Sequence, residues 1–327
     1  MAEVDITDIL MTSVSVVIPV KNEALKIKAC IDGILSQTVK VDEIIVIDSG
    51  STDGTIEILK SYEKVKLIEI AGKDFNHGMT RNLGVSHVKS DYVVLTVGDA
   101  RAYNNYWIEG MLSGFTDNDV VAVCGKQVVP PDKDKNPVDW YRPIGTGSIA
   151  RYQYKDGAFD TLTAVEKKKV CGWDDVTAMY KTDVLKALPF RKTSYSEDAL
   201  WAMDALKAGH AIAYSPEAMV YHYHFENPDY TYKRTFTVLY HMYKFFGYKP
   251  EMYTPNLIEK LRLIKLLMSE NRLSLQEKYR WFVYNIEVRK NLSVAIKDFI
   301  MAIDKGEQVL DDEHERLCGM PPIPPVS

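Results

Sequence analysis

Two apolar segments near the N-terminus constrain the fold of this chain more than any other feature. Residues 14–19 and 44–47 are nearly continuous apolar runs, and about one helix's worth of residues separates them. A strand that is apolar throughout is buried on both faces, which is typical of a parallel sheet covered by helices. The two segments therefore predict an α/β fold built on an open parallel sheet.

Polar side chains follow both segments where each strand ends. They are Asn22 and Glu23 after the first strand, and Asp48, Ser51 and Asp53 after the second. Ligands of open α/β sheets bind outside the carboxyl ends of the strands. The sequence has no G-x-G-x-x-G motif and no Walker lysine loop, so carboxylates and hydroxyls replace the glycines of a dinucleotide fold. This favours binding of a base and a ribose, with a metal ion left to neutralise the phosphates.

The first 130 residues alternate strands with helices, which predicts an open, mostly parallel sheet flanked by helices. The further segments are strands at 65–70, 91–97 and 120–129 and helices at 24–37, 53–62, 80–87 and 106–115.

Residues 130–168 change in character, with a proline pair, a lysine and aspartate run and several glycines. The segment is too long for a plain connector, so it predicts a functional loop or lid. A helix is expected at 196–209, with Ser196 as its N-cap and Gly209 as its C-cap. Short strands are predicted at 211–214 and 218–223.

The chain after Pro228 reads as helical, with segments near 230–247, 255–270 and 275–304. We expect an α/β domain that carries the ligand site over 1–227, a helical extension over 228–312 and a flexible proline-rich tail over 313–327. Three roles stay open for the extension: packing on the main domain, which we favour, self-association as a homo-oligomer, and contact with a membrane surface.

Composition excludes several classes of protein. The net charge of −5 gives no support for a nucleic-acid partner, which usually needs a basic face. The four cysteines are scattered, which argues against a zinc knuckle or a disulfide framework and suits a reducing compartment. The N-terminal residues lack the pattern of a signal peptide, and no apolar run approaches the length of a membrane span. We therefore expect a cytoplasmic protein, with peripheral attachment to the inner face of a membrane as the second option.

Three later segments carry candidate chemistry. Asp99 follows the predicted strand 91–97, where a carboxylate suits a divalent metal ion, although taken alone this position favours an Asp that caps the next loop. Glu197 and Asp198 open a helix, where they either complement its dipole or supply a general base. His222 and His224 are two residues apart on a predicted strand, so both imidazoles share one face and either ligate the metal or simply line a cleft.

The segment 75–82 places further polar groups before and within a short helix. Backbone N–H groups there, together with Arg81 and Asn82, are candidates for binding nucleotide phosphate or sugar.

At this point the chain resembles glycosyltransferase family 2, whose members have the GT-A fold. Several ordered segments over about residues 13–225 carry the resemblance, and the set is far more specific than any one of them. They are residues 15–23, 34–38 and 45–55, Asp99 in the metal position, and residues 196–201. Within the family, residues 48–53, 75–82 and 221–224 look most like the rhamnosyltransferase branch, which typically takes a deoxythymidine-diphosphate sugar.

The resemblance implies a role for each candidate residue. Asp99 would bind Mg²⁺ or Mn²⁺, helped by His222 or His224, and Asp198, with Glu197 beside it, would be the base of a direct, inverting transfer. The remaining residues would hold the donor and acceptor: Pro19, Asn22, Glu23, Asp48, Ser49, Ser51, Asp53, Arg81 and Asn82 around the nucleotide sugar, and Trp173, Asp174 and Asp175 around the sugar and acceptor.

Two departures from the family pattern bear on this assignment. Many members have Asp-Asp where this chain has Asp48-Ser49, so the choice between dTDP- and UDP-sugars stays open. The metal motif has the single acid Asp99 where D-x-D enzymes have two.

The favoured hypothesis is an inverting, metal-dependent glycosyltransferase that moves rhamnose or a related sugar. Its donor would be a nucleotide-diphosphate sugar, and its acceptor a glycan or lipid-linked glycan of a surface polysaccharide. The alternative is a non-catalytic subunit that binds nucleotide sugars and docks a partner enzyme, an alternative motivated by the sparse metal motif. A nucleotidyltransferase ranks last, because Lys21 alone does not make a phosphate-binding loop near the first strand.

Overall fold

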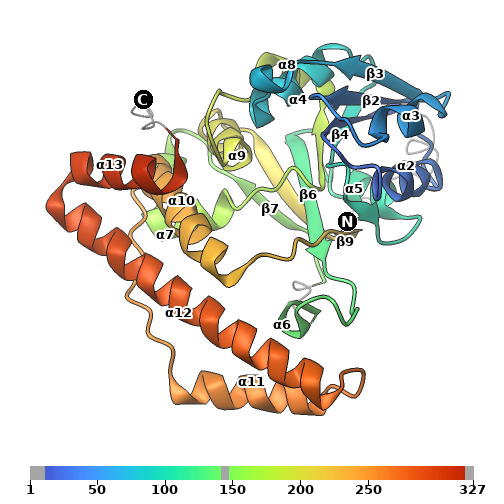
Figure 1. Cartoon of the computed structure of the whole chain (residues 1–327). Coiled ribbons are helices and arrows are strands. Elements are labelled where there is room, and N and C mark those ends of the chain that lie inside the picture. The colour runs from blue at the N-terminus through green and yellow to red at the C-terminus, as the bar shows by residue number, and fades with distance from the viewer. Residues whose placement is uncertain (1–11, 141–146, 321–327) are drawn as a thin grey trace.

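The computed structural model describes residues 12–140 and 147–320 (Figure 1). One sheet forms its centre, and its strands are β1 (Val14–Val20), β2 (Glu43–Asp48), β3 (Val65–Glu69), β4 (Tyr92–Leu95), β5 (Arg101–Ala102), β6 (Val120–Val128), β7 (Ala150–Gln153), β8 (Ala178–Lys181) and β9 (Ala211–Tyr221). The helices are α2 (Ile27–Leu35), α3 (Thr55–Lys60), α4 (His77–Ser86), α5 (Trp107–Leu112), α6 (Pro137–Trp140), α7 (Ala164–Val170), α8 (Thr182–Ala187), α9 (Glu197–Lys207), α10 (Pro228–Phe246), α11 (Leu257–Ser269), α12 (Leu275–Lys305) and α13 (Glu307–Cys318).

The order of strands in the sheet is β3-β2-β1-β4-β8-β6-β9-β5, and β7 pairs with β9. Strands β1 to β4 pair in parallel, as does β6 with β9, whereas β8 runs antiparallel between β4 and β6. Strands β5 and β7 are also antiparallel to β9. The predicted α/β class is confirmed, and the sheet is mixed, with its parallel part at the N-terminal end.

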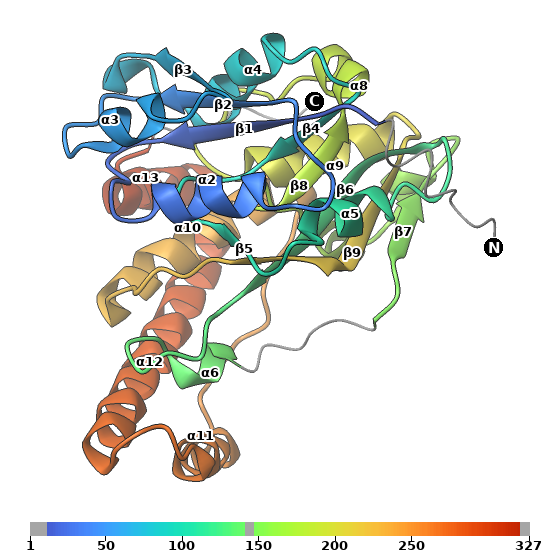
Figure 2. The same ribbon diagram turned by 90° about the vertical axis from the view of Figure 1, so that its right-hand side faces the viewer.

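Strand β1 is buried on both faces, as its sequence predicts. Val14, Val16 and Ile18 belong to one hydrophobic cluster, together with residues of α2 and α5. Val17 belongs to a second cluster, together with residues of α4 and α9. Because successive side chains of a strand point to opposite faces, helices cover both faces of the sheet here (Figure 2).

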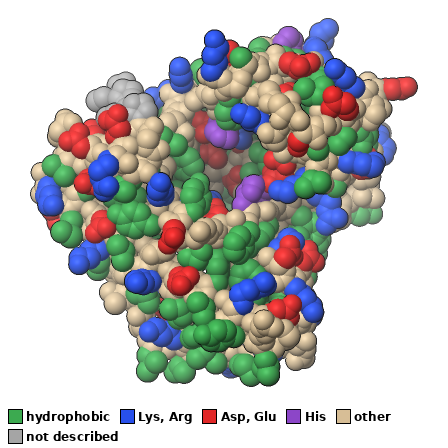
Figure 3. All heavy atoms as spheres, in the orientation of Figure 1, with side chains coloured by type: hydrophobic (Ala, Val, Ile, Leu, Met, Phe, Trp, Pro, Cys, Tyr) green, Lys and Arg blue, Asp and Glu red, His purple; other side chains and the backbone are tan. Residues whose placement is uncertain are grey.

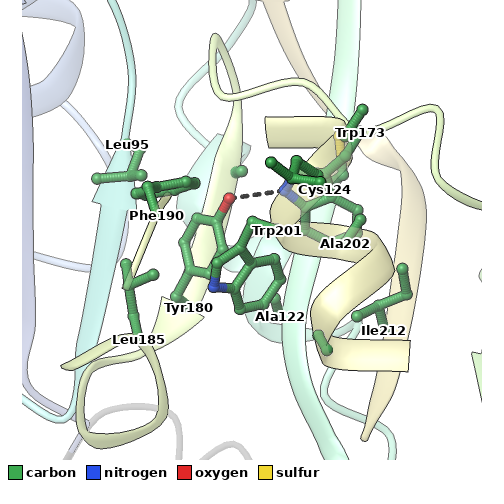
Figure 4. Packing of buried hydrophobic residues seen from close by; sticks show 14 of the residues in the cluster. Leu95, Ala122, Cys124, Trp173, Tyr180, Leu185, Phe190, Trp201, Ala202 and Ile212 are labelled. Carbon is green, nitrogen blue, oxygen red and sulfur yellow. Dashed lines mark hydrogen bonds between the residues drawn. The ribbon is translucent and has the colours of Figure 1, made fainter. Parts of the chain in front are cut away.

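An aromatic cluster lies between α9 and the sheet (Figure 4). The rings of Tyr180 and Trp201 meet edge to face with centroids 4.6 Å apart, and Trp173 and Phe190 pack around them. The Trp173 Nε1 donates a hydrogen bond to the Tyr180 hydroxyl over 2.7 Å. Burial of these large rings, with their polar atoms paired, packs together the segments that precede β8 and α9.

Four local predictions differ from the structure. Residues 211–221 form the single strand β9 rather than two, with irregular pairing to β6. Ser196 makes no side-chain cap and has φ 57°, so the acids of α9 stand at its N-terminus without the predicted N-cap. Residues 130–168 are partly ordered into α6, β7 and α7, while 141–146 lie outside the described residues. The sequence does not predict helix α13, which includes residues 313–318 of the predicted tail. Residues 321–327 of that tail lie outside the described residues.

The predicted C-terminal helices are present as α10, α11 and α12. Helix α10 lies against the main body, because its residues Met242, Phe245 and Phe246 belong to the same hydrophobic cluster as α4 and α9. Helices α12 and α13 pack against α10 through a separate cluster around Phe236 and Phe299. In both views α11 lies at the end of the molecule away from the sheet. Among the described residues, no helix is both long enough and apolar enough to cross a membrane.

Candidate active site

A cavity of about 680 Å³ opens at the carboxyl ends of β1, β2 and β4, where the sequence predicts a ligand. Figure 3 shows this hollow on one face of the molecule, with acidic and histidine side chains inside it. Most of the predicted site residues line it: Pro19, Glu23, Ser49, Arg81, Asp99, Trp173, Asp174, Asp175, Glu197, Asp198, His222 and His224. Those outside its lining are Asn22, Asp48, Ser51, Asp53 and Asn82.

Asp99, His222 and His224 come together at one side of the cavity. Their potential ligand atoms all lie within 4.8 Å of one another. The His222 Nε2 is 3.4 Å from the Asp99 Oδ1, and the His224 Nε2 is 3.3 Å from the Asp99 Oδ2. Asp99 lies between β4 and β5, and both histidines follow β9 directly, so the antiparallel pairing of β5 with β9 brings them together.

The chemistry of this donor set fits a divalent metal ion. One carboxylate and two imidazoles suit a transition divalent cation such as Mn²⁺ better than Mg²⁺, which prefers oxygen ligands. Burial, the largest influence, lowers the pKa of the His224 imidazole and so favours the neutral form that ligates metals. Burial alone would raise the pKa of Asp99, but hydrogen bonding and charge from His222, with His224 and Lys26, hold it well below its usual range.

Two residues that the sequence did not single out support this cluster. The Lys26 Nζ lies 3.1 Å from the Asp99 Oδ2, and the lysine side chain is about half exposed. The Gln127 Oε1 lies 2.6 Å from the His222 Nδ1, and the Gln127 Nε2 donates to Asp174. With a metal ion bound, the amide oxygen would accept from Nδ1–H and the His222 Nε2 would be unprotonated, which is the tautomer that a metal ligand needs.

A second group of carboxylates lies across the cavity at the start of α9. Arg81, which is only 4% exposed, pairs through its NH1 with Glu197, and its Nε is 3.6 Å from the Asp175 Oδ2. The Tyr180 hydroxyl donates to the other oxygen of Asp175. Burial raises the pKa of Asp175 to about 7, although Arg81 acts against it. Arg81 therefore balances the negative charge of the buried acids Glu197 and Asp175.

Asp198 differs from these neighbouring acids. Its Oδ1 accepts the backbone N–H of Ala199, and no basic group within the described parts of the chain lies in ion-pair distance of it. Burial, followed by the charges of Glu197 and Asp175, raises the pKa of Asp198 well above its usual value. Because Arg81 is engaged by the other two acids, Asp198 is the carboxylate best suited to accept a proton.

The loops after β1 and β2 are held together by polar side chains. The Asn22 Oδ1 accepts the Thr52 N–H, and the Asn22 N–H is donated to the Ser51 hydroxyl. Asp53 accepts the Ala24 N–H, and Asp48 accepts the N–H groups of Gly50 and Ser51. These four predicted side chains thus fix the loops.

The neighbouring residues Pro19, Glu23 and Ser49 line the cavity itself. Burial and the nearby charge of Asp99 raise the pKa of the Glu23 carboxyl. Asn82 instead pairs with the backbone of Phe190, donating to its carbonyl and accepting its N–H.

The arrangement places a metal-type ligand set and a carboxylate of raised pKa in one cavity. A metal site of this kind suits a diphosphate, and the carboxylate suits removal of a proton from a hydroxyl. Lys21, Phe75, Tyr195 and Arg234 also line the cavity. Phe75 opens the predicted segment 75–82, whereas no sequence motif points to Tyr195.

Comparison with known proteins shows the family to which this chain belongs. The sequence model described as Glycosyl transferase family 2 matches residues 15–188. The chain is 31% identical over 229 residues to the O-antigen chain rhamnosyltransferase RfbN of Salmonella typhimurium, covering 68% of this chain and 70% of that protein. It is 34% identical over 208 residues to the O-antigen chain rhamnosyltransferase WbaN of Salmonella anatum, covering 61% of this chain and 62% of the relative.

The fold also matches a solved glycosyltransferase. The mannosyltransferase PcManGT of Pyrobaculum calidifontis, solved in complex with GDP-Man and Mn²⁺, aligns with a TM-score of 0.53 at 18% identity. The alignment covers 90% of this chain and 76% of that one, which confirms the expected GT-A fold. The family match extends over more than half of the chain, and this protein therefore belongs to glycosyl transferase family 2 and is a glycosyltransferase.

Proposed function

We propose that this glycosyltransferase moves a sugar from a nucleotide-diphosphate donor to an acceptor hydroxyl by a single inverting displacement with a divalent metal ion bound. One observation carries the proposal: the Asp99, His222 and His224 cluster lines the same cavity as Asp198, a carboxylate without an ion-pair partner among the described residues. The leaving group gains negative charge, which a metal ion at the cluster would offset, and the acceptor hydroxyl loses a proton, which the Asp198 carboxylate would accept.

The donor is proposed to be a dTDP- or UDP-sugar, with rhamnose or a related sugar as the best choice. The names of the two Salmonella relatives support rhamnose. Pro19, Glu23 and Ser49 would contact the nucleoside, since they line the cavity beside the loops that follow β1 and β2. Asn22, Asp48, Ser51 and Asp53 would act indirectly, by holding those loops in place.

Asp99, His222 and His224 would hold the metal, for which their mixed donor set favours Mn²⁺. When bound, this ion supplies positive charge that offsets the charge developing on the diphosphate. Lys26, now paired with Asp99, has a half-exposed side chain and is free to turn toward the phosphates.

The proton is proposed to go to Asp198. The acceptor oxygen forms a bond to the anomeric carbon, its proton passes to the Asp198 carboxylate, and the bond from that carbon to the diphosphate breaks with its electron pair. Glu197 and Asp175 would act as positioning residues, because both are engaged with Arg81. Trp173 and Asp174 line the cavity nearby and would contact the sugar and acceptor.

The acceptor is proposed to be a glycan or lipid-linked glycan in the synthesis of a surface polysaccharide, at the cytoplasmic side of the membrane. The O-antigen role in the names of both Salmonella relatives supports this acceptor class.

The test is a donor panel of dTDP-, UDP- and GDP-sugars with Mn²⁺ and lipid-linked oligosaccharide acceptors. The anomeric configuration of the product is read by NMR. We expect transfer from a dTDP- or UDP-sugar with inversion, and loss of transfer when the metal is removed with a chelator. Transfer with retention, or transfer from GDP-sugars alone, would contradict the proposal.

A further inference from the structure

Helix α11 carries an apolar stripe that no part of the described chain covers. Leu257, Leu261, Ile264 and Met268 are between 42% and 69% exposed. Their spacing of four, three and four residues places them on one side of the helix. Single exposed apolar residues are ordinary on a protein surface, but a continuous stripe along a helix marks an interaction surface.

The stripe is not the face that holds α11 to the protein. The opposite face, with Leu263 and Leu267, is buried in a cluster with Leu273 and Trp281. The helix is also capped by the Asn256 side chain, which accepts the Glu259 N–H. The helix is thus anchored without the stripe, so the exposed residues are available for a partner.

The beginning of α12 extends this apolar surface. Leu275 and Tyr279 are more than 70% exposed, and only residues 270–274 separate α11 from α12. In Figure 3 hydrophobic side chains gather with lysine and arginine side chains at the end of the molecule where Figure 1 places α11.

The charge around the stripe is basic, in contrast to the rest of the protein. Residues 257–283 contain six Lys and Arg and three Glu, a net charge of +3, whereas the whole chain carries −5. Lys260 borders the stripe on one side, and Lys265 and Arg262 border it on the other, all three exposed. A helix with an apolar face edged by lysine and arginine is typical of binding to an anionic membrane surface.

We propose that α11, with the start of α12, docks this enzyme on an anionic phospholipid bilayer. The stripe enters the boundary between headgroups and acyl chains, and Lys260, Arg262 and Lys265 contact the lipid phosphates. The position of α11 at the end of the molecule leaves the stripe free to meet a flat surface.

A second copy of the chain is a poorer occupant of the same face. The stripe has the spacing of the a and d positions of a coiled coil, in which Lys260 and Lys265 take the flanking g and e positions. Two copies would place these lysines against one another in either the parallel or the antiparallel orientation. Like charges at these positions oppose association, whereas anionic headgroups favour it.

The experiment is sedimentation of the full-length protein with phosphatidylcholine vesicles that contain or lack phosphatidylglycerol, without donor or acceptor. The apolar variant is Leu261→Gln with Ile264→Gln, matched by Val165→Gln with Met301→Gln at exposed apolar positions elsewhere. The charge variant is Lys260→Gln with Lys265→Gln, matched by Lys60→Gln with Lys207→Gln. Thermal unfolding checks that every variant folds.

We expect the wild type to sediment with the anionic vesicles only. The apolar and charge variants should each lose about tenfold or more in vesicle affinity, while the matched variants keep it. The proposal is overturned if the wild type does not bind, if both test variants bind as it does, or if the stripe proves to hold a dimer that Leu261→Gln with Ile264→Gln dissociates. The sedimentation experiment does not depend on sugar transfer, so a failure of this proposal is distinguishable from a failure of the proposed function.

Discussion

At the scale of single residues, the electrostatics of the site depend on Arg81, which pairs with two of the three buried acids around it. Arg81 is buried between Glu197 and Asp175, so it lowers the cost of burying these two acids and leaves Asp198 with a raised pKa. The sequence identifies all four residues as candidates, with Arg81 as a candidate for binding nucleotide phosphate or sugar. The two acids that pair with Arg81, Asp175 and Glu197, lie 94 and 116 positions away along the chain, and no local sequence pattern reveals such contacts.

We predict that the Asp198 carboxyl titrates above the ordinary aspartate pKa of 3.8. A raised pKa means that the proton is held at pH values where an ordinary aspartate is already ionised. The acid limb of kcat/KM, measured at saturating Mn²⁺, should therefore lie at higher pH than an ordinary aspartate would give. The direct measurement is a ¹³C carboxyl titration of the metal-free protein, with Asp198→Asn identifying the signal; a midpoint at or below 3.8 would refute the assignment.

Gln127→Leu should weaken Mn²⁺ binding by about tenfold or more, because outer-shell partners of ligating histidines have effects of this size. The leucine cannot accept the His222 Nδ1 proton, so the imidazole loses the contact that fixes its tautomer. Isothermal titration of Mn²⁺ into the protein measures the effect. Gln153→Leu on β7 is the matched control, and equal affinities of the two variants would show that Gln127 has no such role.

At the scale of elements, the sequence predicts the helices and strands that have a regular apolar pattern. Strands β1 and β2 and helix α10 follow their patterns closely, whereas α13 was missed because it is mostly polar and buries little beyond Leu310 and His314. Strand β8 has only four residues and is placed antiparallel between β4 and β6 by tertiary pairing. Gln127 was missed for a related reason, since a glutamine on a strand gives no signal of the histidine that faces it.

Gly84→Ala should destabilise the protein although alanine favours helices. A Cβ there would lie 2.4 Å from the Val17 Cγ1 and 2.7 Å from the Ile47 Cδ1, where α4 packs on β1 and β2. Overpacking costs about 1–3 kcal/mol, and contacts this short belong in the upper part of that range. Helix propensity offsets about 1 kcal/mol, so the net loss should be up to about 2 kcal/mol. Urea unfolding measures it against Ser86→Ala on the exposed side of α4; a Gly84→Ala protein as stable as that control would contradict the close packing.

At the scale of the whole molecule, helix α10 shares a hydrophobic core with the α/β part of the chain. Met242, Phe245 and Phe246 of α10 share a hydrophobic cluster with α4 and α9, and Arg234 and Met242 line the cavity. The boundary that the sequence suggested at residue 227 therefore crosses a shared core. The site is completed by both segments, and a protein cut at that boundary would lose part of the core and part of the cavity wall.

The most direct test of the central claim is the effect of Asp198→Asn on two properties of the whole enzyme, Mn²⁺-dependent donor binding and sugar transfer. If Asp198 is the base, the variant should bind the donor as the wild type does and lose transfer by about 10²–10⁴-fold, the usual contribution of a general base. Asp183→Asn on the exposed start of α8 is the matched control and should keep full transfer. An Asp198→Asn enzyme that transfers sugar at the rate of this control would contradict the account.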